Sequence, residues 1–250
     1  MSLPLFIAET ELPEVGCQVQ LTGAEGRHAA TVRRIEVGEE ILIADGQGGC
    51  VRAEAVTVGK HDLSATVRHK WQEPQPAPRV TVVQALPKSA HAELAVDQAV
   101  QAGADEIVPW AAQRCITRWQ GAKATKARDK WRTTAAAAAK QSRRAWIPQV
   151  TEQVSGKQLC ALVAEKTAAG AIAVVLHESA TDGFAEAIAG ADEASDVLLI
   201  IGPEGGVSDT ELAELTAAGA RTAVLGPTVL RTSAAAAVAL GALGVLTQRW

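Results

Sequence analysis

The sequence predicts an α/β protein with two parts, a small N-terminal domain of β-strands and a larger C-terminal domain built on a mostly parallel sheet. Hydrophobic residues make up 48% and charged residues 21% of the 250 positions, so the chain can bury a core and is not a disordered polymer. Short strand patterns separated by turn residues fill the first part, whereas apolar strand patterns alternate with helical ones in the second. Strands that are apolar throughout indicate a parallel sheet buried on both faces.

The N-terminal part is predicted to be a small β-barrel. An alternating strand is expected at 40–44, and the glycine-rich run DGQGG at Asp45–Gly49 predicts a turn into a second strand that begins at Val51. A further strand pattern, ATVRH, lies at 65–69. Several short strands within so few residues are typical of a barrel.

The connector between the two parts is the run QEPQPAPR at 72–79. Its three prolines predict an extended, semi-rigid segment, and the residue patterns change on either side of it. We therefore expect a first domain at residues 1–73 and a second domain at residues 79–250.

The C-terminal part contains five strand patterns that alternate with helical patterns, including helical segments between the last three strands, and it has no internal repeat. The helical patterns are rich in strong helix formers or small residues, and Gly103 is placed to end the first of them. We expect strands at 79–86, 105–110, 171–179, 196–206 and 221–227, and helices at 92–103, 126–144 and from Ser233 onward.

Polar or glycine-rich segments stand at the ends of the last three strand patterns, each after an apolar run: His177-Glu178, Gly202–Gly206 and Gly226–Thr232. Ligands of open α/β sheets bind at the carboxyl ends of the strands, so these segments are candidates for one site. Neither phosphate-loop pattern fits. A Walker phosphate loop requires Lys-Ser/Thr after its last glycine, but Gly206 is followed by Val207-Ser208. Pro203 has no backbone N–H to donate to an anion.

The Gly-Pro-Glu-Gly-Gly run also has a purely structural interpretation. Ser208 and Glu211, three residues apart, complete a capping box, so the run serves as a strand–turn–helix connection. That interpretation leaves Glu204 unexplained, because a turn needs no anion.

Two further residues near the strand ends are open to two interpretations. His177 is a candidate base or ligand, although a histidine in such a position more often packs. Arg231 precedes a helix start with Thr232 or Ser233 as its N-cap, and it either binds an anion or is a surface residue near that cap.

Charge is distributed unevenly along the chain. The whole chain carries −4, but residues 114–144 contain ten basic residues and one acidic residue, so this segment carries +9 and the remainder −13. A basic patch on an acidic body is typical of a protein that binds a phosphate backbone, and a solvated helix face is the alternative.

Cysteine usage and hydropathy exclude several classes of protein. The four cysteines, Cys17, Cys50, Cys115 and Cys160, are far apart and form no CxxC pair, so we expect no zinc or other metal site and no disulfide framework. The N-terminus lacks the basic and apolar regions of a signal peptide, and the uncharged stretch 232–248 is only marginally long enough to span a bilayer. We expect a soluble, cytoplasmic protein with no membrane partner.

Several blocks of the sequence resemble one family in collinear order. The most specific pair is GPEGGVSDTEL at 202–212 and LGPTVLRTS at 225–233, and LHES precedes them at 176–179. RHAATVRR at 27–34, ALPKSAHAEL at 85–94, AGADEIVPWAAQRC and AAKQSRRAWIPQV match further blocks. Together they resemble the RsmE family of 16S rRNA uridine N3-methyltransferases, within the SPOUT superfamily.

The resemblance implies a fold, a reaction and partners. The fold is a C-terminal SPOUT-type α/β domain with a deep trefoil knot and a small N-terminal PUA-like β-barrel that binds RNA. The implied cofactor is S-adenosyl-L-methionine (SAM), and the implied reaction methylates N3 of a uridine in 16S rRNA, the family's uridine 1498 in the decoding region. The implied partners are 16S rRNA or the small ribosomal subunit, and a second copy of the chain in a homodimer.

Site residues follow from the family's motifs. Loops without a phosphate cradle suit SAM, which has no phosphate, and glycine permits close approach of the backbone. Methylation of N3 displaces a proton, so a base and a cation that stabilises the developing anion are expected. The resemblance assigns Leu176, Gly202, Glu204, Gly205, Leu225, Leu230 and Thr232 to the cofactor site, Arg231, Glu204 and His177 to catalysis, and Arg27, His28, Arg33, Arg34, Lys88, Arg114, Arg143 and Arg144 to RNA binding.

One departure from the family pattern keeps other functions open. The family commonly reads Leu-Arg-Thr-Glu-Thr-Ala where this chain has Ser233 and Ala234 in place of the glutamate and second threonine. Three alternatives therefore stand beside the leading one: a SPOUT methyltransferase for another RNA base, an RNA-binding ribosome-assembly factor with weakened catalysis, and an unrelated α/β enzyme for a small nucleotide.

Overall fold

The computed structural model describes residues 3–8, 10–88 and 91–250, and the chain divides into two compact units. The first unit comprises Met1–Gln75 and Ala139–Ile147, and the second comprises Pro76–Ala138 and Pro148–Trp250. The division after Gln75 falls inside the proline-rich connector. The first unit also includes a segment from the middle of the chain, 139–147, which the expected domain boundaries place in the second domain.

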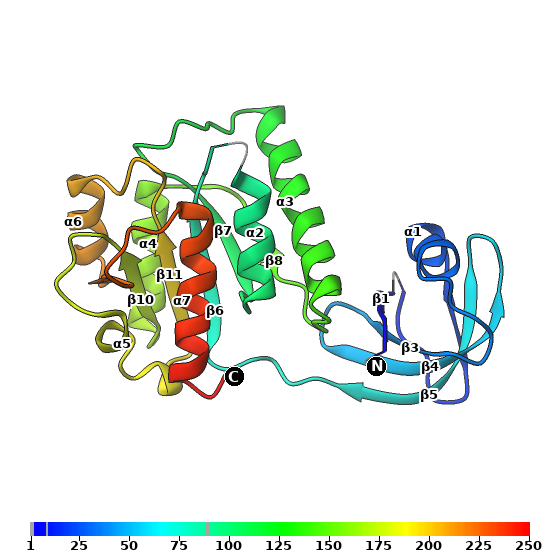
Figure 1. Cartoon of the computed structure of the whole chain (residues 1–250). Coiled ribbons are helices and arrows are strands. Elements are labelled where there is room, and N and C mark those ends of the chain that lie inside the picture. The colour runs from blue at the N-terminus through cyan, green and yellow to red at the C-terminus, as the bar shows by residue number, and fades with distance from the viewer. Residues whose placement is uncertain (1–2, 9, 89–90) are drawn as a thin grey trace. The chain divides into compact units, whose positions relative to one another are not determined.

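The first unit contains a five-stranded sheet in the order β1-β3-β4-β5-β2 (Figure 1). β1 pairs in parallel with β3 and the other pairs are antiparallel, so the described pairings leave β1 and β2 at the two edges. Buried and exposed residues alternate along β2, as expected for a sheet with one face toward a core. The elements are β1 (Leu5–Ile7), β2 (Gln18–Leu21), α1 (Gly23–Arg27), the π-helical turn η1 (His28–Val32), β3 (Glu40–Ala44), β4 (Gly49–Val58) and β5 (Leu63–Gln72).

The glycine-rich turn between β3 and β4 receives the segment from the middle of the chain. Gly48 has φ +89°, and a Cβ atom there would lie 2.5 Å from the ring of Trp146, so only glycine fits. The Gly48 N–H donates to the Ala145 carbonyl (3.2 Å), and the Ile147 N–H donates to the Gly46 carbonyl (2.9 Å). The DGQGG run is therefore a turn, as predicted, and its glycines also make room for Trp146.

The second unit is built on a parallel sheet in the order β12-β10-β11-β6-β7-β8, with β9 paired to β7. Every residue of β11 is buried, which requires cover on both faces of the sheet. The strands are β6 (Arg79–Ala85), β7 (Glu106–Ala111), β8 (Gln149–Val150), β9 (Val154–Ser155), β10 (Ile172–Leu176), β11 (Asp196–Ile201) and β12 (Arg221–Ala223). The predicted α/β fold with a parallel sheet is confirmed.

Helices alternate with these strands. α2 and α7 pack against each other, and α7 also packs on β11, while α4 packs against α6 and β10 (Figure 1). The helices are α2 (Ala92–Gln101), α3 (Ala122–Gln141), α4 (Gly156–Ala168), α5 (Phe184–Ala187), the 3-10 turn η3 (Ala191–Glu193), α6 (Asp209–Ala217) and α7 (Thr232–Leu246). Within the described ranges, no helix is both long and apolar enough to cross a membrane.

Several predicted boundaries were displaced. The helix predicted at 126–144 begins at Ala122 and ends at Gln141, and the strands predicted at 171–179, 196–206 and 221–227 end at Leu176, Ile201 and Ala223. The second and third of these strands are shorter because the glycine and proline residues at their ends belong to the loops that follow, and the first is shorter because the polar run His177–Ser179 lies outside it. Gly103 has φ +110° and follows the C-cap Ala102, so it ends α2 as expected.

Charged groups at the amino ends of the strands are paired and buried. Asp196 at the start of β11 accepts from Lys166 Nζ (2.8 Å) and from the Thr81 hydroxyl (3.2 Å). Asp105 and Arg249 form an ion pair of 2.9 Å in which both side chains are 6% exposed. Arg249 also donates to the carbonyls of Pro78 and Gly103. These contacts hold the C-terminal residues against the start of the sheet.

Candidate functional site

A cavity of about 740 Å³ lies in the second unit at the carboxyl ends of five parallel strands. Its volume is in the range of small-molecule sites, and its position is where ligands of open α/β sheets bind. The loops after β10, β11 and β12 all line it, as the sequence predicted, and the segments after β6 and β7 add Lys88, His91 and Arg114. Of the residues assigned to the cofactor or to catalysis, the cavity is lined by Leu176, His177, Gly202, Glu204, Gly205, Leu225, Leu230, Arg231 and Thr232.

The loop Gly202–Gly206 is a tight turn. The Gly206 N–H donates to the Pro203 carbonyl (2.8 Å), and Gly206 has φ +72°, a conformation that favours glycine. At Gly205 a Cβ atom would lie 3.2 Å from Cβ of Arg114, closer than an ordinary contact. The turn geometry therefore favours glycine at 206 and the close approach of Arg114 favours it at 205, before any ligand is considered.

Arg114 holds this turn in place. Its guanidinium donates to the carbonyls of Gly205 (3.2 Å) and Val207 (3.4 Å). The sequence assigned Arg114 to RNA binding, whereas the structure places it in the wall of the cavity with protein carbonyls as acceptors. Sequence patterns do not predict this contact, because the segments after β7 and β11 lie far apart in the chain.

A capping box starts α6 directly after the turn, as predicted. The Ser208 side chain accepts from the Glu211 N–H (3.2 Å), and Glu211 Oε2 accepts from the Ser208 N–H (3.2 Å). Glu211 is only 3% exposed and its Oε1 accepts from the Gln113 N–H (2.8 Å). Glu211 is therefore a structural carboxylate that joins the segment after β7 to the start of α6.

Glu204 is exposed at the tip of the turn, and one of its oxygens has a partner. Oε1 accepts from the backbone N–H of Lys88, with 3.0 Å between nitrogen and oxygen. In the described part of the chain, no partner is found for Oε2. The carboxylate therefore connects the loop after β11 to the loop after β6 and still presents one oxygen beside the cavity.

His177 is fixed through its backbone and its ring. Its N–H donates to the Ala223 carbonyl (3.0 Å), while Nδ1 lies 3.3 Å from the Ser179 N–H and 2.8 Å from the Ser179 hydroxyl. Because the Ser179 backbone N–H can only donate, Nδ1 is unprotonated and Nε2 carries the hydrogen of the neutral ring. In this tautomer the outer nitrogen donates, which favours His177 as a hydrogen-bond donor rather than as a base.

The start of α7 differs from the prediction. Arg231 is the N-cap residue and no side chain caps the helix, so the expected cap at Thr232 or Ser233 is wrong. The Thr232 hydroxyl instead donates to the Gly202 carbonyl (2.6 Å) and accepts from Gln84 Nε2 (3.1 Å). Arg231 is exposed and lines the cavity.

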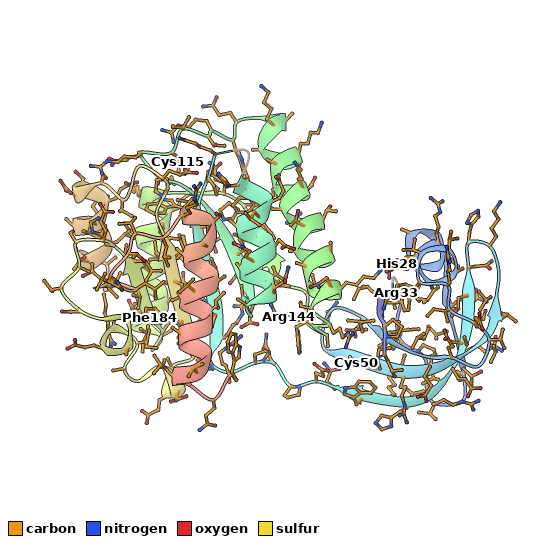
Figure 2. The ribbon with its side chains drawn as sticks, viewed as in Figure 1. His28, Arg33, Cys50, Cys115, Arg144 and Phe184 are labelled. Carbon is orange, nitrogen blue, oxygen red and sulfur yellow. The ribbon has the colours of Figure 1, made fainter. Side chains whose placement is uncertain are left out.

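The residues assigned to RNA binding in the first unit have two kinds of environment. Arg27, Arg33 and Arg34 are exposed, and Arg34 has φ +53°. His28 is half-buried and its ring meets the ring of Phe6 edge-on at 5.6 Å; Figure 2 shows His28 and Arg33 beside α1. Burial and the nearby Lys140 ammonium lower the pKa of His28, which keeps the ring neutral near pH 7. The three arginines are therefore accessible to solvent, whereas His28 packs against Phe6.

The basic segment 114–144 is largely engaged within the fold. Besides Arg114, Arg118 donates to backbone carbonyls, and Lys130 pairs with Glu93 (2.8 Å). The other engaged residues are Arg128, which pairs with Glu152 and Asp129, Arg132, which donates to the Val150 carbonyl (3.1 Å), and Lys140, which pairs with Glu25 (2.6 Å). Lys123, Lys126 and Arg143 are exposed and Arg144 is half-buried. Part of the +9 charge is therefore structural.

Sequence reasoning assigned no role to His91 or Ser179, which line the cavity, or to Gln84, which supports Thr232 from behind it. Glu178, named with His177 as part of a candidate strand-end segment, also lines the cavity. The signal for Gln84 was an amide inside the apolar run RVTVVQAL. No group of three or more His, Cys, Asp or Glu side chains that could hold a metal ion occurs within residues 3–8, 10–88 and 91–250.

Comparison with family models gives two matches. A family described as RNA methyltransferase domain matches residues 73–244, and one described as RNA methyltransferase PUA domain matches residues 21–68. A ribosomal RNA small subunit methyltransferase E from Mycobacterium bovis is 49% identical, over 98% of this chain and 93% of the relative.

Solved structures are similar over nearly the whole chain. A ribosomal RNA small subunit methyltransferase E from Neisseria gonorrhoeae, bound to SAM, superposes with a TM-score of 0.86 at 23% identity, over 98% of each chain. A Legionella pneumophila protein solved in complex with SAM superposes with a TM-score of 0.84 at 25% identity, over 99% of each chain. With the match of its second unit to the RNA methyltransferase domain and its 49% identity to the mycobacterial relative, the chain belongs to the ribosomal RNA small subunit methyltransferase E family.

Proposed function

We propose that the protein transfers a methyl group from SAM to N3 of a uridine in 16S rRNA, the family's uridine 1498. The observation that carries the proposal is the cavity, where three strand-end loops bring Arg231, Glu204 and a glycine-rich turn together. Its supports are the family membership and the SAM complex of the Legionella protein. An rRNA substrate implies a cytoplasmic enzyme.

The cavity lining suits SAM. Leu176, Leu225 and Leu230 supply apolar surface for an adenine ring, and the backbone of the Gly202–Gly206 turn supplies polar groups at close range. Thr232 contributes through the Gly202 carbonyl that its hydroxyl holds. When bound, SAM supplies an electrophilic methyl group, and the chain's residues supply orientation and proton transfer.

The chemistry at the uridine needs a proton acceptor and a cation. Arg231 is exposed at the cavity and is proposed to stabilise the anion that develops on the uracil ring. Glu204 presents Oε2 beside the cavity while Oε1 is held by the Lys88 N–H, so Glu204 is proposed to accept the N3 proton. His177 is proposed to orient the substrate through Nε2–H, because Nδ1 already accepts from Ser179.

RNA is proposed to bind exposed cations on both units. These residues position the phosphate backbone, and an unpaired uridine enters the cavity. The residues proposed are Arg27, Arg33 and Arg34 in the first unit and Lys88, Lys123 and Lys126 in the second, with Arg143, Arg144, His28 and Arg114 in supporting positions. Binding should weaken steeply with salt, and an affinity that is independent of salt would contradict this surface.

The finer features of the fold are also proposals. We propose a trefoil knot formed by the loops around the cavity, a closed PUA-like barrel in the first unit, and a homodimer. α7 leaves Val238, Val245 and Leu246 exposed at 45%, 74% and 50%, which supports a dimer through this helix. Light scattering should give twice the monomer mass at micromolar concentration, and an experimental chain trace through 202–232 tests the knot.

Two measurements test the function. Calorimetry should show one SAM bound per chain. Small subunits or 16S rRNA from cells lacking the protein should gain N3-methyluridine on addition of the protein and SAM, as read by nucleoside mass spectrometry. Methylation of another base would identify a SPOUT methyltransferase with a different RNA substrate, and rRNA binding without methylation would identify an assembly factor.

A further inference from the structure

We propose that Gln84 is a positioning residue for the methyl-transfer site. It is the next-to-last residue of β6, in the interior of the parallel sheet, and is only 1% exposed. Its neighbours Val83 and Ala85 are fully buried, so an apolar side chain would be expected at this position. The inference rests on the proposed SAM site, because Gln84 acts on the loops that form it.

The direction of the hydrogen bonds is determined by their end points. Gln84 Nε2 lies 3.0 Å from the Ala85 carbonyl, which only accepts, so the NH₂ group of the amide must face it. The Thr232 hydroxyl lies 2.6 Å from the Gly202 carbonyl and gives its single hydrogen to that oxygen. The hydroxyl therefore accepts from Gln84 Nε2 (3.1 Å). The hydrogen bonds run in one direction, from Gln84 through Thr232 to Gly202.

This chain of bonds joins the two loops that carry the proposed chemical groups. Thr232 follows Arg231 directly and is the first residue of α7. Gly202 begins the turn that presents Glu204. Because the Thr232 hydroxyl belongs to α7 and donates to Gly202 in the turn, its orientation sets the separation between the start of α7 and the turn. Gln84 fixes that orientation and reaches neither the cavity nor the substrate.

The same amide is unfavourable for stability. Gln84 Oε1 is buried and has no hydrogen-bond partner in the part of the chain that the structure describes. A buried acceptor without a partner has lost its hydrogen bonds to water and lowers stability, which an apolar side chain of similar shape avoids. Stability alone would thus favour methionine or leucine here. The amide is explained by the geometry that it imposes on Thr232.

The test replaces the amide and follows stability, loop protection and cofactor binding in the unliganded and SAM-loaded protein. Gln84→Met keeps the side-chain length and removes both the donor and the unsatisfied acceptor. We expect an unfolding midpoint equal to or above that of the parent, amide exchange of Gly202 and residues 204–207 faster by about tenfold, and SAM affinity lower by about tenfold, the equivalent of one hydrogen bond.

A matched control lies on the same strand. Thr81 is also 1% exposed, but its hydroxyl contacts Asp196 and Glu106 at the other end of the sheet. Thr81→Val should lower stability and leave both loop exchange and SAM affinity within about twofold of the parent.

Each outcome decides for or against the role of Gln84. Unchanged exchange of Gly202 and residues 204–207 in Gln84→Met would overturn it, as would a loss of stability like that of Thr81→Val without a change in the loop. Thr232→Val should reproduce the loop effect, and the double variant should be no worse than either single one, because the bonds act in series. Fully additive effects contradict the series. If the parent binds no SAM, the proposed function fails, while loop exchange in the unliganded protein still tests Gln84.

Discussion

The two ends of the parallel sheet treat charge in opposite ways. At the amino end, Asp196 and Asp105 are buried and paired with cations. At the carboxyl end, Glu204 and Arg231 are exposed on loops beside the cavity, and among the described residues neither forms an ion pair with the other. The same strands supply both ends. The difference teaches that charge in this domain contributes to stability where it is buried and to ligand binding where the loops leave it exposed.

The largest expected effect on stability comes from removing an ion pair at the amino end of the parallel sheet. Arg249→Met leaves the Asp105 carboxylate buried without its cation and should lower the free energy of unfolding by about 3–5 kcal/mol. Urea unfolding measures the change, and SAM affinity at 25 °C should stay near the parent value. Arg52→Met is the matched control, because its pair with Glu40 is about half exposed and should contribute less than about 1 kcal/mol. Equal costs for the two variants would contradict the comparison.

The next largest effect comes from removing the Arg231 side chain at the carboxyl end of the sheet. Arg231→Ala should lower the single-turnover rate of methyl transfer by about 10²–10³-fold, the usual loss of one group that stabilises an anion. Because Arg231 is exposed, the free energy of unfolding should change by less than about 0.5 kcal/mol. Arg231→Lys should recover part of the rate. A full rate in the alanine variant at saturating SAM would remove Arg231 from the mechanism.

Glu204→Gln separates the two uses of one carboxylate. The amide oxygen still accepts the Lys88 N–H, so the loop should keep its position and SAM affinity should be unchanged. Loss of the proton acceptor should lower the rate by about 10²-fold. Single-turnover rRNA methylation at saturating SAM measures the rate. An unchanged rate would leave Glu204 with only its structural contact.

The capping boxes give a smaller and graded effect. Ser155→Ala at the exposed start of α4 should cost about 1 kcal/mol of unfolding free energy. Ser208→Ala at the start of α6 should cost up to about 2 kcal/mol, because Ser208 is buried and also contacts Gln113. Thermal unfolding of the two variants, which are matched in chemistry, measures the difference. Equal losses of unfolding free energy in the two variants would show that the buried cap at the start of α6 stabilises the protein no more than the exposed cap of α4.

The smallest effect is measured by thiol labelling of the unaltered protein, so no hydrogen bond or ion pair is removed. Burial raises the pKa of Cys50 to about 12 and also raises the pKa of Cys115, which lies beside the cavity wall after β7; both are labelled in Figure 2. Cys17 is exposed. At pH 8 a thiol reagent should therefore modify Cys17 first and should reach Cys50 and Cys115 only after unfolding. Fast labelling of Cys115 would show that the loops at the carboxyl end open.

Much of the second unit could be predicted because its signals are local. Apolar runs, helix formers and the Ser208–Glu211 capping box place strands and helices correctly to within a few residues. The three strand-end segments line one cavity because the carboxyl ends of parallel strands meet at one edge. The cap at the start of α7 was predicted wrongly, because the Thr232 hydroxyl binds the Gly202 carbonyl of a distant loop instead of a backbone N–H of its own helix.

The sequence by itself determined the fold class and the segments that surround the cavity, since these depend on periodicity and turn residues, and its motifs indicated the family by their resemblance to it. Only the tertiary structure decided what individual polar groups do. It placed Arg114 against the glycine turn, Gln84 behind Thr232, Lys130 and Lys140 in ion pairs, and residues 139–147 in the first unit. The physical reason is that a hydrogen bond or ion pair depends on distances of a few ångströms between residues far apart in the chain, and neither periodicity nor composition records those distances.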